Sequence, residues 1–190
     1  MEAFPSLRIS ADALVPQGSF AESQAAYLEP DRATVEALDA LLREKKIGVV
    51  AHYYMDPELQ GVLAACEWPH IGVSDSLLMA DRGIKMVEAG CKAIIVLGVD
   101  FMSENARAML DAAGHQAVPV YRVAEAEIGC SLAESAEADA YTKYLKDGAR
   151  AKNPLHVVYI NTSLITKAKA HNIVPTITCT SSNVVQTVLQ

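Results

Sequence analysis

The chain has 190 residues, of which 51% are hydrophobic, with a formal net charge of −7 and a sequence pI near 5.2. This length fits one domain, or one domain and part of another, and the hydrophobic content is sufficient for a core. The acidic balance argues against nucleic acid or an anionic membrane as the main partner, and no apolar stretch is long enough to span a bilayer.

Residues 1–30 contain several prolines with weak periodicity, and we expect them to form a lead-in segment. Because acidic residues outnumber Arg8, this segment fits neither a secretory signal nor a good transit peptide. The folded part is expected to start near Asp31, a suitable N-cap. An apolar face then predicts a helix that ends near Lys45.

The chain is organised around residues 47–60. A short β-branched apolar run at 47–51 predicts a buried parallel strand. His52 and two tyrosines follow where this strand ends, and Asp56-Pro57 is typical of a helix start. In open α/β sheets ligands bind at such strand ends, and a helix N-terminus favours anions. On this stretch alone, the alternative that these aromatic residues only pack in the core stays open.

The same order of strand, polar residues and helix recurs along the chain. Further strands are expected at 71–73, 93–97, 117–121, 156–160 and 176–179, with the strand that contains Pro119 weaker and nearer an edge. Further helices are expected at 77–89, 101–113 and 131–146, then from the residue after Ser163 up to His171, and finally from about residue 184 onward.

This pattern predicts an α/β fold: an αβα three-layer domain with a mainly parallel sheet over residues 31–150. Residues 151–190 are expected to begin a second, similar α/β domain. The chain ends at Gln190 inside an expected helix, without a C-cap or a returning strand. We therefore expect a missing part to complete the second domain.

Polar side chains follow the expected strands at several points. They are His52 and Tyr54, Ser74 to Ser76, Asp100, Tyr159 with Asn161 and Ser163, and Thr180 to Ser182. Each serine, threonine, asparagine or aspartate among them is, taken alone, explained as an ordinary N-cap. Because parallel strands place their carboxyl ends at one edge, the set together predicts a shared pocket. Such a pocket suits a small molecule with carboxylates or a phosphate.

Four widely spaced cysteines without a Cys-x-x-Cys pair argue against a zinc ribbon and a dense disulfide framework. Cys66 and Cys91 lie on or beside expected helices, where a thiol is usually a small core residue. Cys130 stands between Gly129, which frees the backbone, and Ser131, which can begin a helix. A helix N-terminus favours a thiolate, so we expect Cys130 to be partly exposed with a helix N-terminus near its sulfur.

Six motifs occur in the order found in one known family. They are Ala51 to Tyr54 with Pro57 to Gln60, Asp75 to Leu77, Gly98 to Glu104, Gly129 to Ala133, Tyr159 to Ser163 and Cys179 to Asn183. On these residues the chain resembles quinolinate synthase, the iron–sulfur enzyme of de novo NAD synthesis, over roughly residues 45–190. Residues 55–58 and 68–71 look most like the plant and algal plastid form. This likeness implies that the protein is located in the plastid. If the likeness to the plastid form does not hold, a cytoplasmic location is expected.

The resemblance implies an activity. The family condenses iminoaspartate with dihydroxyacetone phosphate to give quinolinate, phosphate and water, which makes it a transferase. In the family three cysteines, one from each of three similar domains, hold a [4Fe–4S] cluster whose open iron acts as a Lewis acid. An aspartate-oxidising enzyme is expected to supply iminoaspartate, and a homodimer is also considered.

The resemblance also implies roles for single residues. Cys130 matches a cluster ligand, and two further cysteine ligands are expected outside this chain. The matching catalytic residues are His52, Tyr54, Tyr159 and Asn161, and the matching substrate-binding residues are His52, Ser76, Tyr159, Asn161 and Ser181. An imidazole titrates near neutrality and can donate or accept, whereas a phenol is a poor base and is interpreted first as a donor.

Two alternatives stay open. Because the family's later cysteines, histidine and glutamate are absent, the 190-residue chain alone is expected to bind no stable cluster and make no quinolinate. It is then a non-catalytic module that binds an anionic metabolite or assembles with a longer subunit. A cysteine hydrolase is a more distant alternative, because Cys130 has no nearby base in the sequence.

Overall fold

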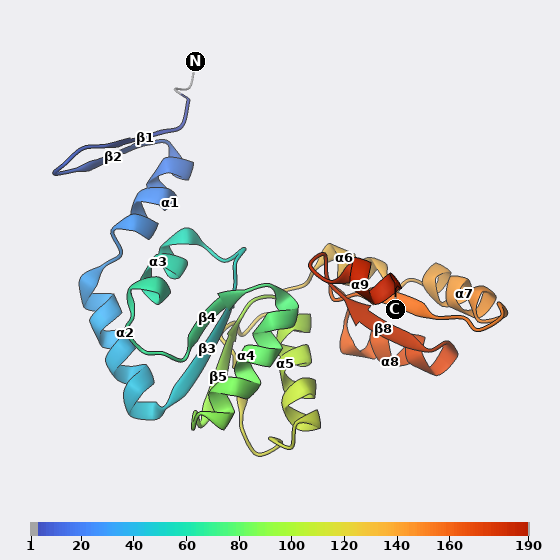
Figure 1. The fold of residues 1–190 in the computed structure, drawn as a ribbon. Coiled ribbons are helices and arrows are strands. Elements are labelled where there is room, and N and C mark those ends of the chain that lie inside the picture. Colours follow the sequence, from blue (N-terminus) through green and yellow to red (C-terminus); the bar gives the residue numbers. More distant parts are fainter. Residues whose placement is uncertain (1–3, 190) are drawn as a thin grey trace.

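The computed structural model describes residues 4–189, which form two α/β units that follow one another along the chain (Figure 1). The first unit is built on parallel strands β3 (Ile47–His52), β4 (Ile71–Ser74), β5 (Ala93–Leu97) and β6 (Val120–Arg122). They lie in the order β4-β3-β5-β6. The predicted parallel sheet is confirmed, and the strand that follows Pro119 lies at its edge as predicted.

Helices cover both faces of this sheet (Figure 1). They are α2 (Arg32–Lys45) and α3 (Pro57–Ala65) on one face, and α4 (Ser76–Glu88) and α5 (Asp100–Ala112) on the other. Side chains alternate between the faces along a strand. Val49 accordingly packs with Leu42 and Leu63, whereas Val50 packs in a separate core with Leu110. This is the three-layer arrangement that the sequence predicts.

The second unit repeats the beginning of the first. It contains β7 (His156–Tyr159), α8 (Leu164–Ile173), β8 (Thr176–Cys179) and α9 (Val184–Leu189), and its two strands are parallel. A small core of Leu145, Ala170 and Val174 lies under α8. The pattern of strand, cap and helix therefore continues after Pro154, while the division into domains at residue 150 stays a prediction.

The strand register shows how closely the two units correspond. His52 pairs with Ser74 in the first unit, and Tyr159 pairs with Cys179 at the same place in the second. Two residues beyond these strand ends, Tyr54 corresponds to Asn161 and Ser76 corresponds to Ser181. The predicted site residues thus occupy equivalent positions in two copies of one structural motif.

The predicted N-caps Asp31 and Asp56, and the polar cap before α4, are confirmed, whereas the N-cap of α5 is Val99 and not Asp100. The Asp31 carboxylate accepts a hydrogen bond from the Thr34 N–H at 2.8 Å, and the Asp56 carboxylate accepts one from the Glu58 N–H at 2.9 Å. Asp75 accepts from two N–H groups of the first turn of α4 at 2.9 and 3.0 Å. A carboxylate at these positions satisfies N–H groups that the helix itself leaves unpaired.

The prediction of one helix over 131–146 is wrong. The structure has a short α6 (Ser131–Ser135) and a separate α7 (Asp139–Gly148), and the N-cap of α6 is Cys130. The Ser135 hydroxyl donates to the Ser131 carbonyl at 2.7 Å, and Ala138 is extended, with φ −66° and ψ 147°. Serine bonding back to the backbone competes with helix continuation, and Asp139 then begins a new helix.

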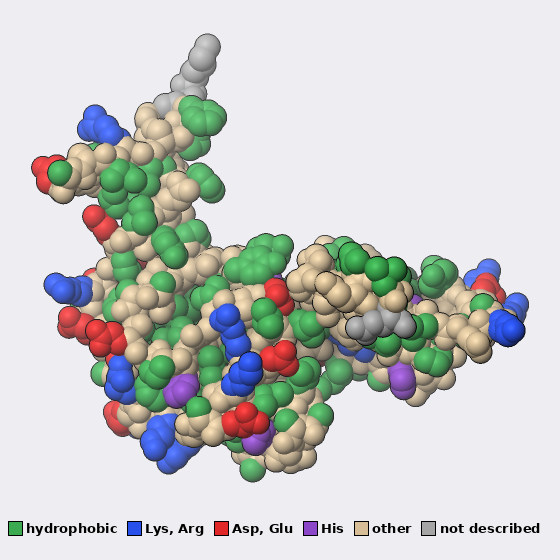
Figure 2. Space-filling view, in the orientation of Figure 1, with side chains coloured by type: hydrophobic (Ala, Val, Ile, Leu, Met, Phe, Trp, Pro, Cys, Tyr) green, Lys and Arg blue, Asp and Glu red, His purple; other side chains and the backbone are tan. Residues whose placement is uncertain are grey.

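The segment before Asp31 contains regular elements that the sequence did not predict. Strands β1 (Ser6–Ile9) and β2 (Leu14–Gln17) form an antiparallel hairpin, and α1 (Ser19–Leu28) follows. This arm projects from the first unit (Figure 1). Figure 2 shows apolar side chains along it, and Phe4 and Phe20 are 89% and 66% exposed. The folded structure therefore begins well before residue 31.

The arm is docked through Gly61 on α3. A Cβ atom at Gly61 would lie 2.6 Å from the Tyr27 carbonyl oxygen and 2.8 Å from the Tyr27 Cα, both backbone atoms of α1. Glycine therefore permits the two helices to approach. We expect Gly61→Ala to lower the free energy of unfolding by about 1–3 kcal/mol, the usual cost of overpacking.

The matched control is Gly148→Ala, because a Cβ atom there meets nothing within 4 Å. This substitution is expected to raise stability by about 0.5 kcal/mol through the entropy of the unfolded chain. Urea denaturation measures both variants. Changes of the same sign in the free energy of unfolding of the two variants would contradict the docking of α1 on α3.

Candidate functional site

His52 ends β3 and lies in a cluster of aromatic rings. Its side chain is 5% exposed, and its ring centroid is 4.5 Å from those of both Tyr53 and Tyr54. The Tyr54 backbone N–H donates to His52 Nδ1 at 3.2 Å. Burial lowers the pKa of His52, although the charge of Asp75 opposes this. The imidazole is therefore neutral near pH 7, and its free donor is Nε2–H.

Tyr159 and Ser181, from the ends of β7 and β8, contact each other. Their hydroxyl oxygens are 3.3 Å apart. The pKa of Tyr53 is raised, first by a hydrogen bond with Tyr54 and then by desolvation, with smaller contributions from Asp75 and Tyr159. The ring of His52 contacts that of Tyr53, and the Tyr159 hydroxyl pairs with that of Ser181; that both pairs face one site stays a prediction.

The loop before Cys130 is fastened to the N-terminus of α5. The Asp100 carboxylate forms an ion pair with Arg122 and accepts hydrogen bonds from the Ile128 N–H at 3.1 and 3.2 Å. The Asp100 N–H in turn donates to the Ile128 carbonyl at 3.0 Å. The strand-end aspartate therefore fixes the loop that delivers Cys130.

Cys130 is half-buried in the wall of a cavity of about 410 Å³. Other residues in this wall are Phe101, Glu104 and Ser163, which come from both α/β units. Asn161 Nδ2 lies 3.9 Å from the Cys130 Sγ atom. A side-chain amide donor from the second unit is therefore directed at the thiol of the first.

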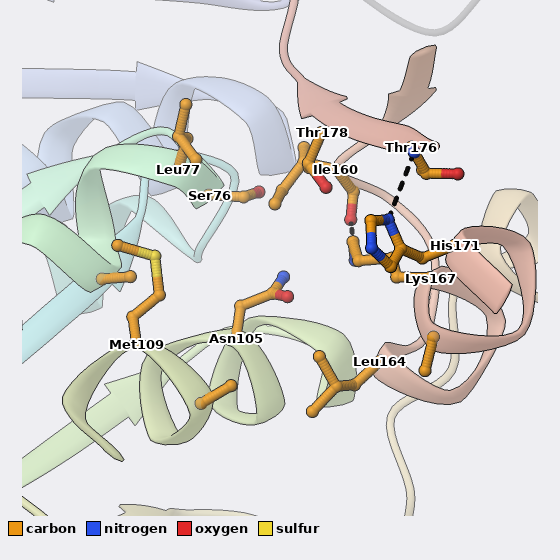
Figure 3. Close-up of a pocket in the computed structure, with 13 residues that line it drawn as sticks. Ser76, Leu77, Asn105, Met109, Ile160, Leu164, Lys167, His171, Thr176 and Thr178 are labelled. Atoms are coloured by element: carbon orange, nitrogen blue, oxygen red, sulfur yellow. Dashed lines mark hydrogen bonds between the residues drawn. The ribbon is translucent and has the colours of Figure 1, made fainter. Parts of the chain in front are cut away.

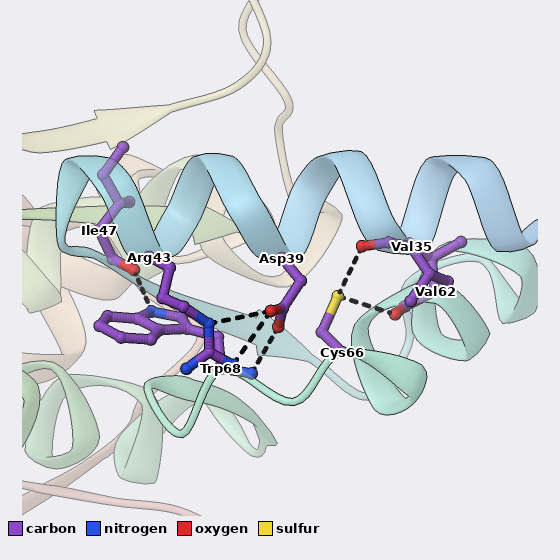
Figure 4. Close-up of polar contacts among 7 residues, drawn as sticks. All are labelled: Val35, Asp39, Arg43, Ile47, Val62, Cys66 and Trp68. Atoms are coloured by element: carbon purple, nitrogen blue, oxygen red, sulfur yellow. Dashed lines mark hydrogen bonds and ion pairs between the residues drawn. The ribbon is translucent and has the colours of Figure 1, made fainter.

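The other three cysteines have different surroundings. Cys91 and Cys179 are 5% and 3% exposed. The Cys66 thiol lies 3.3 Å from the Val62 carbonyl and 3.8 Å from the Val35 carbonyl (Figure 4). Burial raises the pKa of all three thiols, which keeps them protonated near neutral pH. The positions of Cys66 and Cys91 agree with the prediction that they are packing residues.

A second cavity of about 410 Å³ lies between the two units (Figure 3). Ser76, which is 4% exposed, and Asn105 line it from the first unit, and Lys167 and Thr178 line it from the second. Within residues 4–189, Asn105 Nδ2 has no hydrogen-bond partner. A buried amide in a cavity of this size has room for water.

The structure brings the predicted site residues together as pairs. The pairs are His52 with Tyr54, Tyr159 with Ser181, and Asn161 with Cys130, while Ser76 lines the cavity between the units. Sequence reasoning missed the involvement of Lys167. Two lysines alternate with alanines on α8, and nothing local distinguishes Lys167 from Lys169.

These features define an α/β protein with a candidate ligand site at the carboxyl ends of parallel strands in two repeated units. A family model described as "Quinolinate synthetase A protein" matches residues 36–190. The chain belongs to this family.

Curated relatives agree with the family match. Chloroplastic quinolinate synthases from Nicotiana tabacum and Arabidopsis thaliana are 63% and 62% identical over the whole chain. A quinolinate synthase from Prochlorococcus marinus is 33% identical over 80% of the chain and 38% of its own length. The chain spans about a quarter of the length of the plant relatives, 26% and 27%.

Proposed function

We propose that the chain is part of a quinolinate synthase. This transferase condenses iminoaspartate with dihydroxyacetone phosphate to quinolinate, phosphate and water in de novo NAD biosynthesis. The observation that carries the proposal is the contact of Asn161 with the half-buried Cys130 thiol, in a chain of this family. Cys130 lines a cavity large enough for a small metabolite, and the Asn161 amide reaches its thiol from the other unit.

The residues of the strand ends suit anionic substrates. Tyr54, Tyr159 and Ser181 offer hydroxyl donors, and Ser76 stands in the first turn of α4, where a helix favours a carboxylate or phosphate oxygen. His52 offers its Nε2–H to a substrate oxygen. Because its imidazole is neutral, it can also accept a proton during the reaction. Asn161 orients the bound intermediate beside Cys130.

The donor set fits one corner of a [4Fe–4S] cluster. Cys130 lines a cavity, whereas the other three thiols are buried or lie against backbone carbonyls. Within residues 4–189 there is no group of three or more His, Cys, Asp or Glu side chains that could hold a metal ion. Cys130 would therefore hold one iron, and we propose that the two further cysteine ligands lie outside this chain. When bound, such a cluster supplies an open iron as a Lewis acid.

Location and partners are part of the same proposal. The plant relatives are named chloroplastic, and we propose the plastid for this chain as well. An aspartate-oxidising enzyme as supplier of iminoaspartate, and a homodimer, remain proposals. None of the helices within residues 4–189 is long and apolar enough to cross a membrane.

The test compares two proteins. A full-length protein containing this chain is loaded anaerobically with iron and sulfide and given iminoaspartate and dihydroxyacetone phosphate. It should form quinolinate, whereas the 190-residue chain alone should form none and hold no stable cluster, because it brings one candidate ligand. A cluster-loaded, full-length protein that makes no quinolinate would contradict the proposal. Binding of either substrate by that protein would then favour the metabolite-binding alternative.

A further inference from the structure

Lys167 on α8 turns its side chain back to the loop that follows β7. Its Nζ donates to the Ile160 carbonyl at 2.9 Å and also to the Thr162 carbonyl. These two carbonyls stand on either side of Asn161, and both residues are buried, at 4% and 5% exposure. Figure 3 shows the ammonium group beside Ile160 at the edge of the cavity between the units. One cation therefore fixes the backbone immediately before and after Asn161.

The first unit supplies the surroundings of this cation. The Phe101 ring centroid on α5 lies 5.7 Å from Lys167 Nζ. The Glu104 carboxylate, one turn along the same helix, accepts a hydrogen bond from the Leu164 N–H at 2.9 Å. Burial lowers the pKa of Lys167 to about 8, while the negative charge of Glu104 raises it. A partly desolvated ammonium is costly unless its hydrogen bonds are satisfied, and here two carbonyls satisfy it.

These contacts connect to the cavity at Cys130. Phe101 and Glu104 lie in the wall of that cavity, and the Asn161 amide lies 3.9 Å from the Cys130 thiol. A displacement of the 160–162 backbone would move the amide away from the sulfur. We propose that Lys167 is a positioning residue that holds Asn161 against Cys130, and thereby sets the geometry of the reaction; this rests on the proposed function.

The test uses the full-length, cluster-loaded protein. Lys167→Met removes the ammonium and keeps the length of the apolar stem. Because misplacing a reacting group by about 1 Å can cost about 100-fold, we expect kcat for quinolinate to fall about 10- to 100-fold. Cluster absorbance should stay unchanged, because Cys130 itself is intact. Lys169→Met is the matched control, since Lys169 is exposed on the same helix, and its kcat should equal that of the parent.

A double-mutant cycle separates positioning from general stability. If Lys167 acts through Asn161, then Lys167→Met should have little further effect on kcat in an Asn161→Ala background. Independent effects that multiply, or a parental kcat in Lys167→Met, would overturn the inference. If Lys167→Met is insoluble, Lys167→Ala also removes the donors to the Ile160 and Thr162 carbonyls, and a parental kcat for it would overturn the inference in the same way. A parent protein without quinolinate synthesis instead refutes the proposed function, so the two failures are distinguishable.

Discussion

Replacing Cys130 with alanine in the full-length protein is expected to abolish both the brown absorbance of the cluster and quinolinate formation. The thiol is half-buried in a cavity wall, with an amide donor 3.9 Å from its sulfur. Cysteine thiolates are the usual protein ligands of iron–sulfur clusters, and the methyl group of alanine cannot ligate iron. The measurement is anaerobic reconstitution with iron and sulfide, followed by absorbance, iron content and a quinolinate assay.

Cys66→Ala is the control for this experiment. Its thiol lies against two backbone carbonyls in the first unit and faces α2 and α3 (Figure 4). Cluster and activity should both be retained, at a stability cost of about 1 kcal/mol, typical of point substitutions. A Cys130→Ala protein with a normal cluster would remove the central assignment. Equal loss in both variants would point to misfolding rather than ligation.

Local sequence patterns were sufficient to predict most of the helices and strands. The apolar run at 47–51 and the caps Asp56 and Asp75 depend on neighbours within a few residues, and the structure has them as predicted. The split of residues 131–146 was missed because it depends on one hydroxyl that bonds back to the chain. Helical periodicity does not record such a bond.

Long-range contacts account for the other differences. Helix α1 is short, and its docking on α3 depends on a glycine that permits close approach of two backbones. In the sequence Gly61 is only a weak point in a helix, since glycine lowers helix propensity. The role of α1 therefore becomes visible only when the Tyr27 backbone is found beside Gly61.

The sequence predicted which residues of the candidate site lie at strand ends, but it did not predict which of them contact each other. Strand ends marked His52, Tyr159 and Asn161, because polar residues directly follow apolar runs. The partner of Asn161 is 31 residues away in the chain, and the distance from the Lys167 Nζ to the backbone around Asn161 is set by a folded loop. The first contact joins separate units and the second lies within the second unit, and no local pattern specifies either of them.

Asp100→Ala is expected to loosen the loop that carries Cys130. The carboxylate has Arg122 and the Ile128 N–H as partners and begins α5, where a negative charge is favourable. Its loss leaves two donors unpaired. Because hydrogen bonds to charged groups contribute more than neutral ones, we expect the free energy of unfolding to fall by about 2–3 kcal/mol. In the full-length protein, reconstituted iron and quinolinate formation should fall with it.

Asp111→Ala provides the comparison, because Asp111 also pairs with an arginine but stands at the surface. The Arg107 Nη1 and Nη2 groups remain bonded to the Val118 and His115 carbonyls when Asp111 is removed, so both keep an acceptor. An exposed pair of this kind contributes less than about 0.5 kcal/mol, and iron content should stay at the parental level. Urea denaturation and iron analysis of both variants measure the difference. If Asp100→Ala matched Asp111→Ala in stability and in bound iron, the loop before Cys130 would owe its position to contacts other than the Asp100 carboxylate.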